Sequence, residues 1–158
     1  MKFTFGDGTD AISWRSSKLV MESTPGRRLT VLVVDDHEDT RQMSLLVLHS
    51  QGFAPTAASG AEDAFAHAVE QRPDVIVTDL AMPDGDGWDL LQKLSADERT
   101  KAIPVVMVTA CATEAVRERA AREGVDSFFF KPCPPDVLAA ELRRLCGQTS
   151  SPLLVPQR

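Results

Sequence analysis

Long apolar runs are missing from this sequence. No stretch approaches the roughly 18 consecutive apolar residues that cross a bilayer. The first 20 residues also lack the apolar segment of a signal peptide, because charged side chains interrupt them at Asp7, Asp10, Arg15 and Lys18. We therefore expect a cytoplasmic protein without membrane insertion.

Cysteine is scarce, and the glycine-rich motifs of nucleotide-binding proteins are absent. The three cysteines, Cys111, Cys133 and Cys146, have no C-x-x-C spacing of the kind used in zinc or redox sites. We expect them to be buried or half-buried thiols. Neither G-x-x-x-x-G-K-S/T nor G-x-G-x-x-G occurs, which argues against nucleotide binding.

Basic charge is in short supply across the central part of the chain. Residues 29–147 carry 11 Lys/Arg against 20 Asp/Glu, a balance of −9. Residues 1–28, by contrast, carry five basic and three acidic side chains. Since an acidic domain repels the phosphate backbones of nucleic acids, we do not expect it to bind DNA or RNA directly.

The length of 158 residues suits one domain with a single hydrophobic core. Residues 1–28 show no helical or strand periodicity and contain the turn signal Ser23–Gly26, which predicts a flexible leader. The tail, residues 148–158, contains two prolines and is predicted to be disordered. The domain is expected to span residues 29–147.

Within the domain, short apolar runs alternate with segments of helical periodicity. Continuous apolar runs are typical of strands that are buried on both faces, and glycine or proline marks the end of several helices. Alternating strands and helices with short connections predict an α/β fold with a parallel sheet covered on both faces. The predicted strands are Leu29–Val34, Phe53–Ala58, Val75–Thr78, Ile103–Thr109 and Ser127–Phe130, and the predicted helices are Asp39–Gln51, Ala61–Gln71, Asp86–Ala96, Glu114–Glu123 and Pro135–Cys146.

Chemically active side chains stand where four of these strands end. The first strand is followed by Asp35 and Asp36, the third by Asp79 and the fifth by Lys131, while the fourth ends in Thr109. Ligands of such sheets bind beyond the carboxyl ends of the strands. We therefore expect three carboxylates, one hydroxyl and one amine to meet in a shallow pocket.

This set of groups suits phosphoryl transfer. Three adjacent carboxylates resist simultaneous ionisation unless a cation joins them, and Mg²⁺ prefers oxygen ligands. Transfer requires positioning and neutralisation of the phosphoryl oxygens, which the metal, the Lys131 ammonium and the Thr109 hydroxyl could share. One carboxylate remains as nucleophile to form an acyl phosphate, and Asp79 on the central strand is the natural choice.

The same residues, taken in order, resemble the signature set of response-regulator receiver domains. Asp35-Asp36 follows LTVLVV, Asp79 begins DLAMPDGDGWDLL, and Thr109-Ala110 and Lys131-Pro132 come after. The intervals of 43 residues from Asp36 to Asp79, 30 to Thr109 and 22 to Lys131 fit that family. The resemblance covers roughly residues 29–147. It implies a doubly wound, flavodoxin-like sheet of five strands in the order 2-1-3-4-5, and a cis bond before Pro132.

The resemblance also implies roles for the residues at the strand ends. Asp79 is expected to be the phosphoacceptor, with Mg²⁺ held by Asp35, Asp36, Asp79 and the backbone carbonyl of Ala81. Lys131 is expected to pair with the phosphoryl group.

A second group of residues is expected to transmit the signal and set its duration. Thr109 would swing toward the phosphoryl group, and Phe128 stands where the family has a rotating aromatic switch residue. Ala81 and Cys111 flank the expected path of the hydrolytic water. Neither can hold a water well, since alanine has no polar side-chain atom and a thiol bonds weakly. We therefore expect a long-lived phosphorylated state.

The resemblance implies a phosphorelay protein that is no conventional enzyme, because it catalyses only its own phosphorylation and dephosphorylation. Its phosphodonor would be a histidine kinase or a histidine phosphotransfer protein. Its output would pass to an unknown downstream protein through a surface formed by the fourth helix, the fifth strand and the fifth helix.

Some of these residues also resemble parts of other motifs. Asp84 could begin a calcium loop, but Ser95 occupies the twelfth position, where that loop needs glutamate. His37 stands where aspartate-nucleophile phosphatases need a second aspartate, and no pocket for an external substrate is visible in the sequence. For His37, His49 and His67 we expect surface or helix-packing roles. Two alternatives stay open: a phosphate-independent interaction module with the same fold, and Phe128 as an ordinary core residue.

Overall fold

The computed structural model describes residues 27–82, 86–110 and 113–147. Apart from Arg27 and Arg28, the predicted leader lies outside these ranges, as does the predicted tail. None of the helices within the described ranges is long and apolar enough to cross a membrane.

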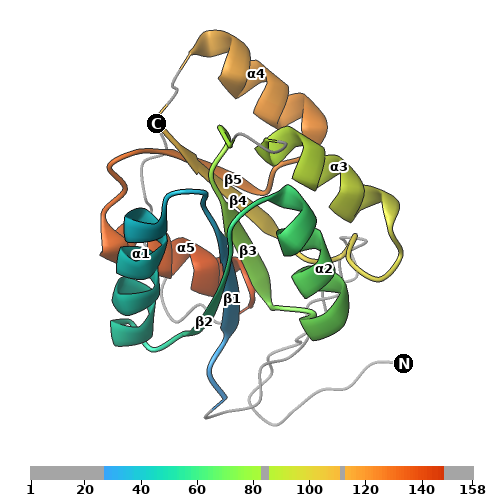
Figure 1. The fold of residues 1–158 in the computed structure, drawn as a ribbon. Coiled ribbons are helices and arrows are strands. Elements are labelled where there is room, and N and C mark those ends of the chain that lie inside the picture. The colour runs from blue at the N-terminus through green and yellow to red at the C-terminus, as the bar shows by residue number, and fades with distance from the viewer. Residues whose placement is uncertain (1–26, 83–85, 111–112, 148–158) are drawn as a thin grey trace, which may run out of the picture.

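The central sheet has five parallel strands. They are β1 (Thr30–Val34), β2 (Ala54–Ala58), β3 (Val75–Thr78), β4 (Val105–Thr109) and β5 (Ser127–Phe130), in the spatial order β2-β1-β3-β4-β5. Five helices connect and follow them: α1 (Glu38–Ser50), α2 (Ala61–Gln71), α3 (Gly87–Ala96), α4 (Glu114–Glu123) and α5 (Pro135–Leu145). Figure 1 shows α1 and α5 on one face of the sheet and α2, α3 and α4 on the other. The predicted fold class and strand order are confirmed.

Two hydrophobic cores lie on opposite faces of the sheet. Alternate residues of β1 point to opposite sides, so that Val31 and Val33 pack under α1 and α5 while Leu32 and Val34 pack under α2 and α3. All four are at most 4% exposed. Burial on both faces explains why the strands are continuous apolar runs in the sequence.

Four elements, α2, β3, α4 and β5, have the predicted bounds, and the boundaries of the other six differ from the predicted ones by one or two residues. The fourth strand begins at Val105, because Pro104 has no N–H for the ladder, although its carbonyl oxygen accepts a hydrogen bond from Ile76 N at 3.0 Å. The first helix begins at Glu38, one residue earlier than predicted, with His37 as its N-cap.

Candidate functional site

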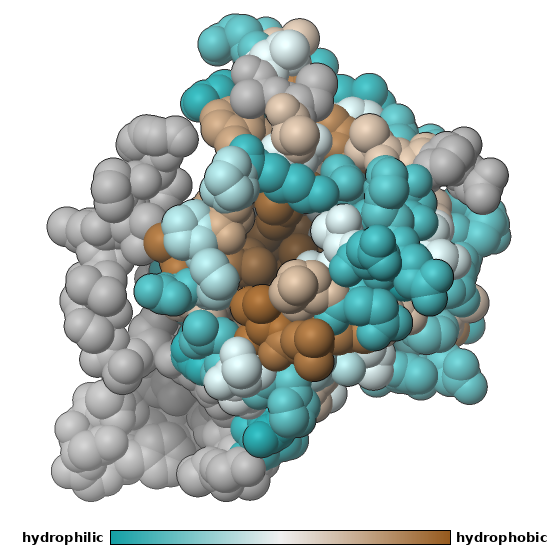
Figure 2. Space-filling view, turned by 60° about the vertical axis from the view of Figure 1, so that its left-hand side comes forward, coloured by the Kyte–Doolittle hydropathy of each residue, from teal (hydrophilic) through white to brown (hydrophobic). Residues whose placement is uncertain are grey.

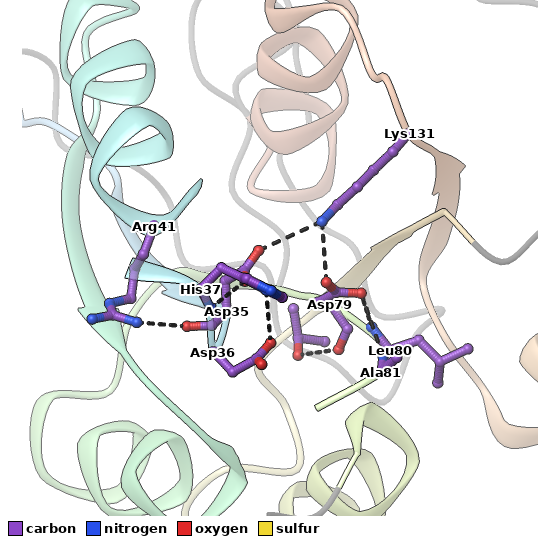
Figure 3. A network of polar contacts seen from close by, with 9 residues as sticks. Asp35, Asp36, His37, Arg41, Asp79, Leu80, Ala81 and Lys131 are labelled. Carbon is purple, nitrogen blue, oxygen red and sulfur yellow. Dashed lines mark hydrogen bonds and ion pairs between the residues drawn. The ribbon is translucent and has the colours of Figure 1, made fainter. Parts of the chain in front are cut away.

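The carboxyl ends of β1, β3 and β5 bring the predicted charged residues together (Figure 3). The Nζ atom of Lys131, which directly follows β5, lies 3.0 Å from Asp79 Oδ2 and 3.5 Å from Asp35 Oδ2. The amine thus bridges carboxylates that follow two neighbouring strands. The structure thus brings together Asp35, Asp79 and Lys131, three of the five residues that were expected to meet in the pocket.

Asp35 is the most deeply placed carboxylate of the site, with 5% of the residue exposed. Its Oδ1 accepts a hydrogen bond from His37 N at 2.9 Å, and its backbone carbonyl accepts one from Arg41 Nη1 at the same distance. The turn from β1 into α1 is therefore tied to this one residue, which fixes where its carboxylate points.

Asp79 is held by its own loop but remains accessible. Its Oδ1 accepts hydrogen bonds from Leu80 N at 2.6 Å and from Ala81 N at 3.4 Å. Its side chain is 14% exposed, and its Oδ2 faces Lys131 at the edge of the pocket. Backbone amides therefore hold Oδ1 in place, and Oδ2 is the oxygen that can react.

The electrostatics keep Lys131 charged. Partial burial by itself would lower the pKa of its ammonium, but the hydrogen bond and the charge of Asp79, together with Asp35, outweigh burial and raise that pKa. The site therefore offers a permanent cation beside Asp79 at neutral pH.

The donor set fits a hard divalent cation such as Mg²⁺. Within the described residues, Asp36 Oδ1 is buried and accepts no hydrogen bond. Asp35, Asp36 and His37 place their potential ligand atoms within 4.8 Å of one another. A buried carboxylate oxygen without a donor is costly unless a cation compensates it, and Mg²⁺ prefers oxygen ligands. Ala81 is exposed beside Asp79, and its carbonyl as a further ligand stays a prediction.

The predicted switch residues lie on β4 and β5, which are neighbours at one edge of the sheet. Thr109 is 1% exposed at the end of β4, and its carbonyl oxygen accepts a hydrogen bond from Lys131 N at 2.8 Å. Phe128 on β5 is half-buried, packs on the core beneath α2, α3 and α4, and contacts the ring of Phe130 edge-on at 5.4 Å between centroids. The two residues lie on neighbouring strands, but the register pairs Thr109 with Phe130 and Phe128 with Met107. Their switching roles stay predictions.

The position of the His37 ring was not predicted from the sequence. It is a surface residue as expected, with its side chain 76% exposed, but its Nδ1 lies 3.4 Å from Asp36 Oδ1 and 3.7 Å from Asp35 Oδ1. The only signal in the sequence was its place directly after the aspartate pair.

Further predictions concern the peptide bond before Pro132 and the three cysteines. The bond between Lys131 and Pro132 is cis, as the resemblance implied. Burial raises the pKa of the half-buried Cys133 thiol and raises that of the buried Cys146 to about 12. Cys111 lies outside the described residues, so its placement stays a prediction.

An apolar groove adjoins the site between α1 and α5. Its volume is about 490 Å³, and Figure 2 shows this side of the molecule with a hollow of apolar side chains framed by hydrophilic ones. A smaller cavity of about 170 Å³ reaches Asp35, Asp79 and Lys131. Both are lined by Thr40 and Cys133, so the groove adjoins the acidic pocket.

Comparisons with known proteins agree with this geometry. Residues 31–143 match the response regulator receiver domain. The chain is 34% identical over 120 residues to the phosphate regulon transcriptional regulatory protein PhoB of Escherichia coli, covering 76% of this chain and 52% of PhoB. It is 36% identical over 131 residues to the probable transcriptional regulatory protein TcrX of Mycobacterium tuberculosis, covering 82% and 54%. The chain thus spans about half the length of these relatives.

Solved structures share the fold. Vibrio cholerae chemotaxis protein CheY4 superposes with a TM-score of 0.70 at 28% identity, covering 75% of this chain and 99% of that protein. The receiver domain of sensor histidine kinase PA1611 from Pseudomonas aeruginosa gives 0.71 at 26% identity, covering 77% and 99%, and holds a magnesium ion in its active-site cleft. This chain belongs to the response-regulator receiver family, the signalling modules of two-component systems.

Proposed function

We propose that this receiver is phosphorylated on Asp79 by the phosphohistidine of a histidine kinase or phosphotransfer protein. The observation that carries the proposal is the position of the Lys131 ammonium, which lies 3.0 Å from Asp79 Oδ2 and 3.5 Å from Asp35 Oδ2. An acceptor needs an accessible carboxylate oxygen, and the groups around it must neutralise the incoming phosphoryl charge. Asp79 has both.

The chain's own residues divide the work of the transfer. Asp79 Oδ2 forms the new P–O bond while the P–N bond of the phosphohistidine breaks, and the released imidazole takes up a proton. Lys131 then moves its hydrogen bond from the carboxylate to a phosphoryl oxygen, and the loop amides of Leu80 and Ala81 hold Asp79 Oδ1 in place. Mg²⁺ bound by Asp35, Asp36, Asp79 and the Ala81 carbonyl would neutralise phosphoryl charge.

The signal leaves through a protein contact. The Thr109 hydroxyl turns toward the phosphoryl group, and Phe128 on the neighbouring strand then changes its packing. The surface of α4, β5 and α5 is the part of the molecule that this change reaches, because Phe128 belongs to β5. The reaction that the chain catalyses is limited to its own phosphorylation and dephosphorylation.

The face with α1 is the best-placed surface for the phosphodonor. Met43 and Leu46 on α1 are 60% and 67% exposed, although both are large and apolar. They lie on the helix that lines the groove adjoining the acidic pocket. Exposed apolar side chains beside a reactive group are typical of a protein interaction site.

Intact-mass measurement tests the proposal. The chain is incubated with acetyl phosphate and Mg²⁺, and we expect one added phosphoryl group that disappears when a chelator removes the metal. A phosphate-independent interaction module, the alternative function, would show no added mass under these conditions. The convergence of Asp35, Asp79 and Lys131 does not favour that alternative.

A further inference from the structure

We propose that His37 Nδ1 is an additional ligand of the cation in this pocket, and that it makes the site favour transition-metal dications over Mg²⁺ more strongly than carboxylates alone would. The proposal rests on the proposed function, because it assumes that the pocket holds a divalent cation. It assigns His37, whose side chain has no other described polar partners than Asp35 and Asp36, a part in metal selection.

The backbone places the imidazole over the carboxylates. His37 is the N-cap of α1 with extended φ and ψ of −88° and 120°, and its N–H donates to Asp35 Oδ1. Serine, threonine, aspartate and asparagine are preferred at an N-cap because their side chains bond the first amides of the helix. The His37 side chain makes no such bond. The imidazole is therefore not engaged by its own helix, and it lies beside the two carboxylates (Figure 3).

The distances suit shared coordination. Two ligand atoms that are each about 2.1 Å from one octahedral cation lie about 3.0 Å apart when they are adjacent. His37 Nδ1 is 3.4 Å from Asp36 Oδ1 and 3.7 Å from Asp35 Oδ1, so a small rotation of this exposed ring closes the difference. Asp36 Oδ1 is the same buried oxygen that accepts no hydrogen bond.

Lys131 does not compete for this position. Its ammonium contacts Oδ2 of Asp35, whereas His37 approaches Oδ1 of the same carboxylate. The amine and the imidazole therefore use different oxygens of Asp35. A cation shared by His37, Asp35 Oδ1 and Asp36 Oδ1 would therefore leave the contact of Lys131 with Asp35 Oδ2 in place.

The consequence for selectivity follows from ligand chemistry. Mg²⁺ prefers oxygen ligands and keeps several of its waters. Imidazole nitrogen is a good ligand for the later first-row dications, and affinity rises from Mn²⁺ through Co²⁺ to Ni²⁺. The contribution of His37 to the binding affinity should therefore be absent for Mg²⁺ and should grow from Mn²⁺ through Co²⁺ to Ni²⁺.

Calorimetric titration of the full, tag-free chain with each of the four ions tests the proposal. In His37→Ala we expect the affinity for Ni²⁺ to fall by roughly tenfold or more, as is typical when a group that tunes a metal site is lost. The fall should be smaller for Co²⁺, smaller again for Mn²⁺, and absent for Mg²⁺. The matched control is His67→Ala, which removes another imidazole near a carboxylate, 3.9 Å from Asp63 Oδ1, and should change none of the four affinities.

A spectroscopic measurement separates ligation from a general effect of charge or shape. Electron spin-echo measurements on bound Mn²⁺ should show coupling to a nitrogen in the wild-type chain and in His67→Ala, but not in His37→Ala. Equal losses of affinity for all four ions, or nitrogen coupling that survives in His37→Ala, would overturn the role of His37. If the wild-type chain binds none of the four ions, the cation site of the proposed function fails as well.

Discussion

A β-carbon at Gly87 would lie 2.7 Å from the carbonyl oxygen of Asp79. Gly87 is the first residue of α3, and its N–H donates to the Leu80 carbonyl oxygen at 2.7 Å. The start of α3 therefore rests directly against the loop that carries the acceptor. Only glycine permits this approach, because the contact is to backbone atoms that have little room to shift.

Substitution Gly87→Ala should both destabilise the domain and disturb the acceptor. We expect a loss of about 1–3 kcal/mol in the free energy of unfolding, as for other overpacked sites. Phosphorylation by acetyl phosphate should also slow, because the loop that orients Asp79 must move. Chemical denaturation and intact-mass time courses measure the two effects.

Gly60→Ala is the matched control. Gly60 is the N-cap of α2, and a β-carbon there meets nothing within 4 Å. The control should leave the rate of phosphorylation unchanged and lower stability only through the poorer N-cap. Equal phosphorylation rates for Gly87→Ala and the wild-type chain would show that the contact does not position Asp79.

Asp74 should contribute to stability in a pH-dependent way. Its carboxylate accepts hydrogen bonds from Thr30 N and Thr30 Oγ1, at 2.8 and 3.0 Å, and pairs with Arg27, joining the starts of β1 and β3. Burial alone would raise the pKa of Asp74, but these partners outweigh burial and lower it. We expect Asp74→Ala to lose about 2 kcal/mol at pH 7, because a charged hydrogen-bond acceptor is removed from a partly buried N–H.

The sign of the pH dependence follows from that lowered pKa. A carboxyl group with a lower pKa in the folded state stabilises the fold above its unfolded pKa of 3.8, and this stabilisation is lost as the pH falls through the folded value. The difference between wild type and Asp74→Ala should therefore shrink below pH 3.8. Arg27→Ala should cost less, since Arg27 is 41% exposed and surface ion pairs contribute little. A difference that is constant from pH 7 to pH 3 would contradict the assignment.

Much of the fold could be predicted from the sequence, because burial on both faces produces continuous apolar strands. The pocket followed from the residues at the strand ends, and the strand order from the family resemblance. The contact of Gly87 with Asp79 and the position of the His37 ring could not be predicted, since both depend on distances between segments that only the folded chain fixes. The apolar run Leu45–Leu48 also did not predict which face of α1 packs on the sheet. Only Leu48 of this run is fully buried, because consecutive residues of a helix face different directions.

Thr109→Ala should separate phosphorylation from signalling. The variant keeps Asp79, Lys131 and the carboxylates, so we expect it to accept the phosphoryl group. The spectral change that accompanies modification should be reduced, because the hydroxyl that reports the phosphoryl group is missing. Two-dimensional NMR of the β5 amides with beryllofluoride measures the change, and full wild-type shifts in the variant would show that Thr109 does not couple the two events.

Ala81 and Cys111 should together set the lifetime of the phosphorylated state. Ala81 is exposed next to Asp79 and has no polar side-chain atom to orient water. Substituting Ala81→Asn and Cys111→Glu together should accelerate loss of the phosphoryl group by about tenfold, or roughly 1.4 kcal/mol of barrier. Intact mass after removal of the donor follows the decay. An unchanged rate, or a wild-type half-life of seconds, would mean that these positions do not control hydrolysis.

The most direct test of the account locates the phosphoryl group. Borohydride reduces an acyl phosphate to an alcohol, so the phosphorylated aspartate acquires a distinct residue mass in a peptide map. We expect this mark on Asp79 alone, and none in Asp79→Asn treated in the same way. A mark on Asp35 or Asp36, or a phosphoryl group that persists in Asp79→Asn, would contradict the assignment of Asp79 as the acceptor.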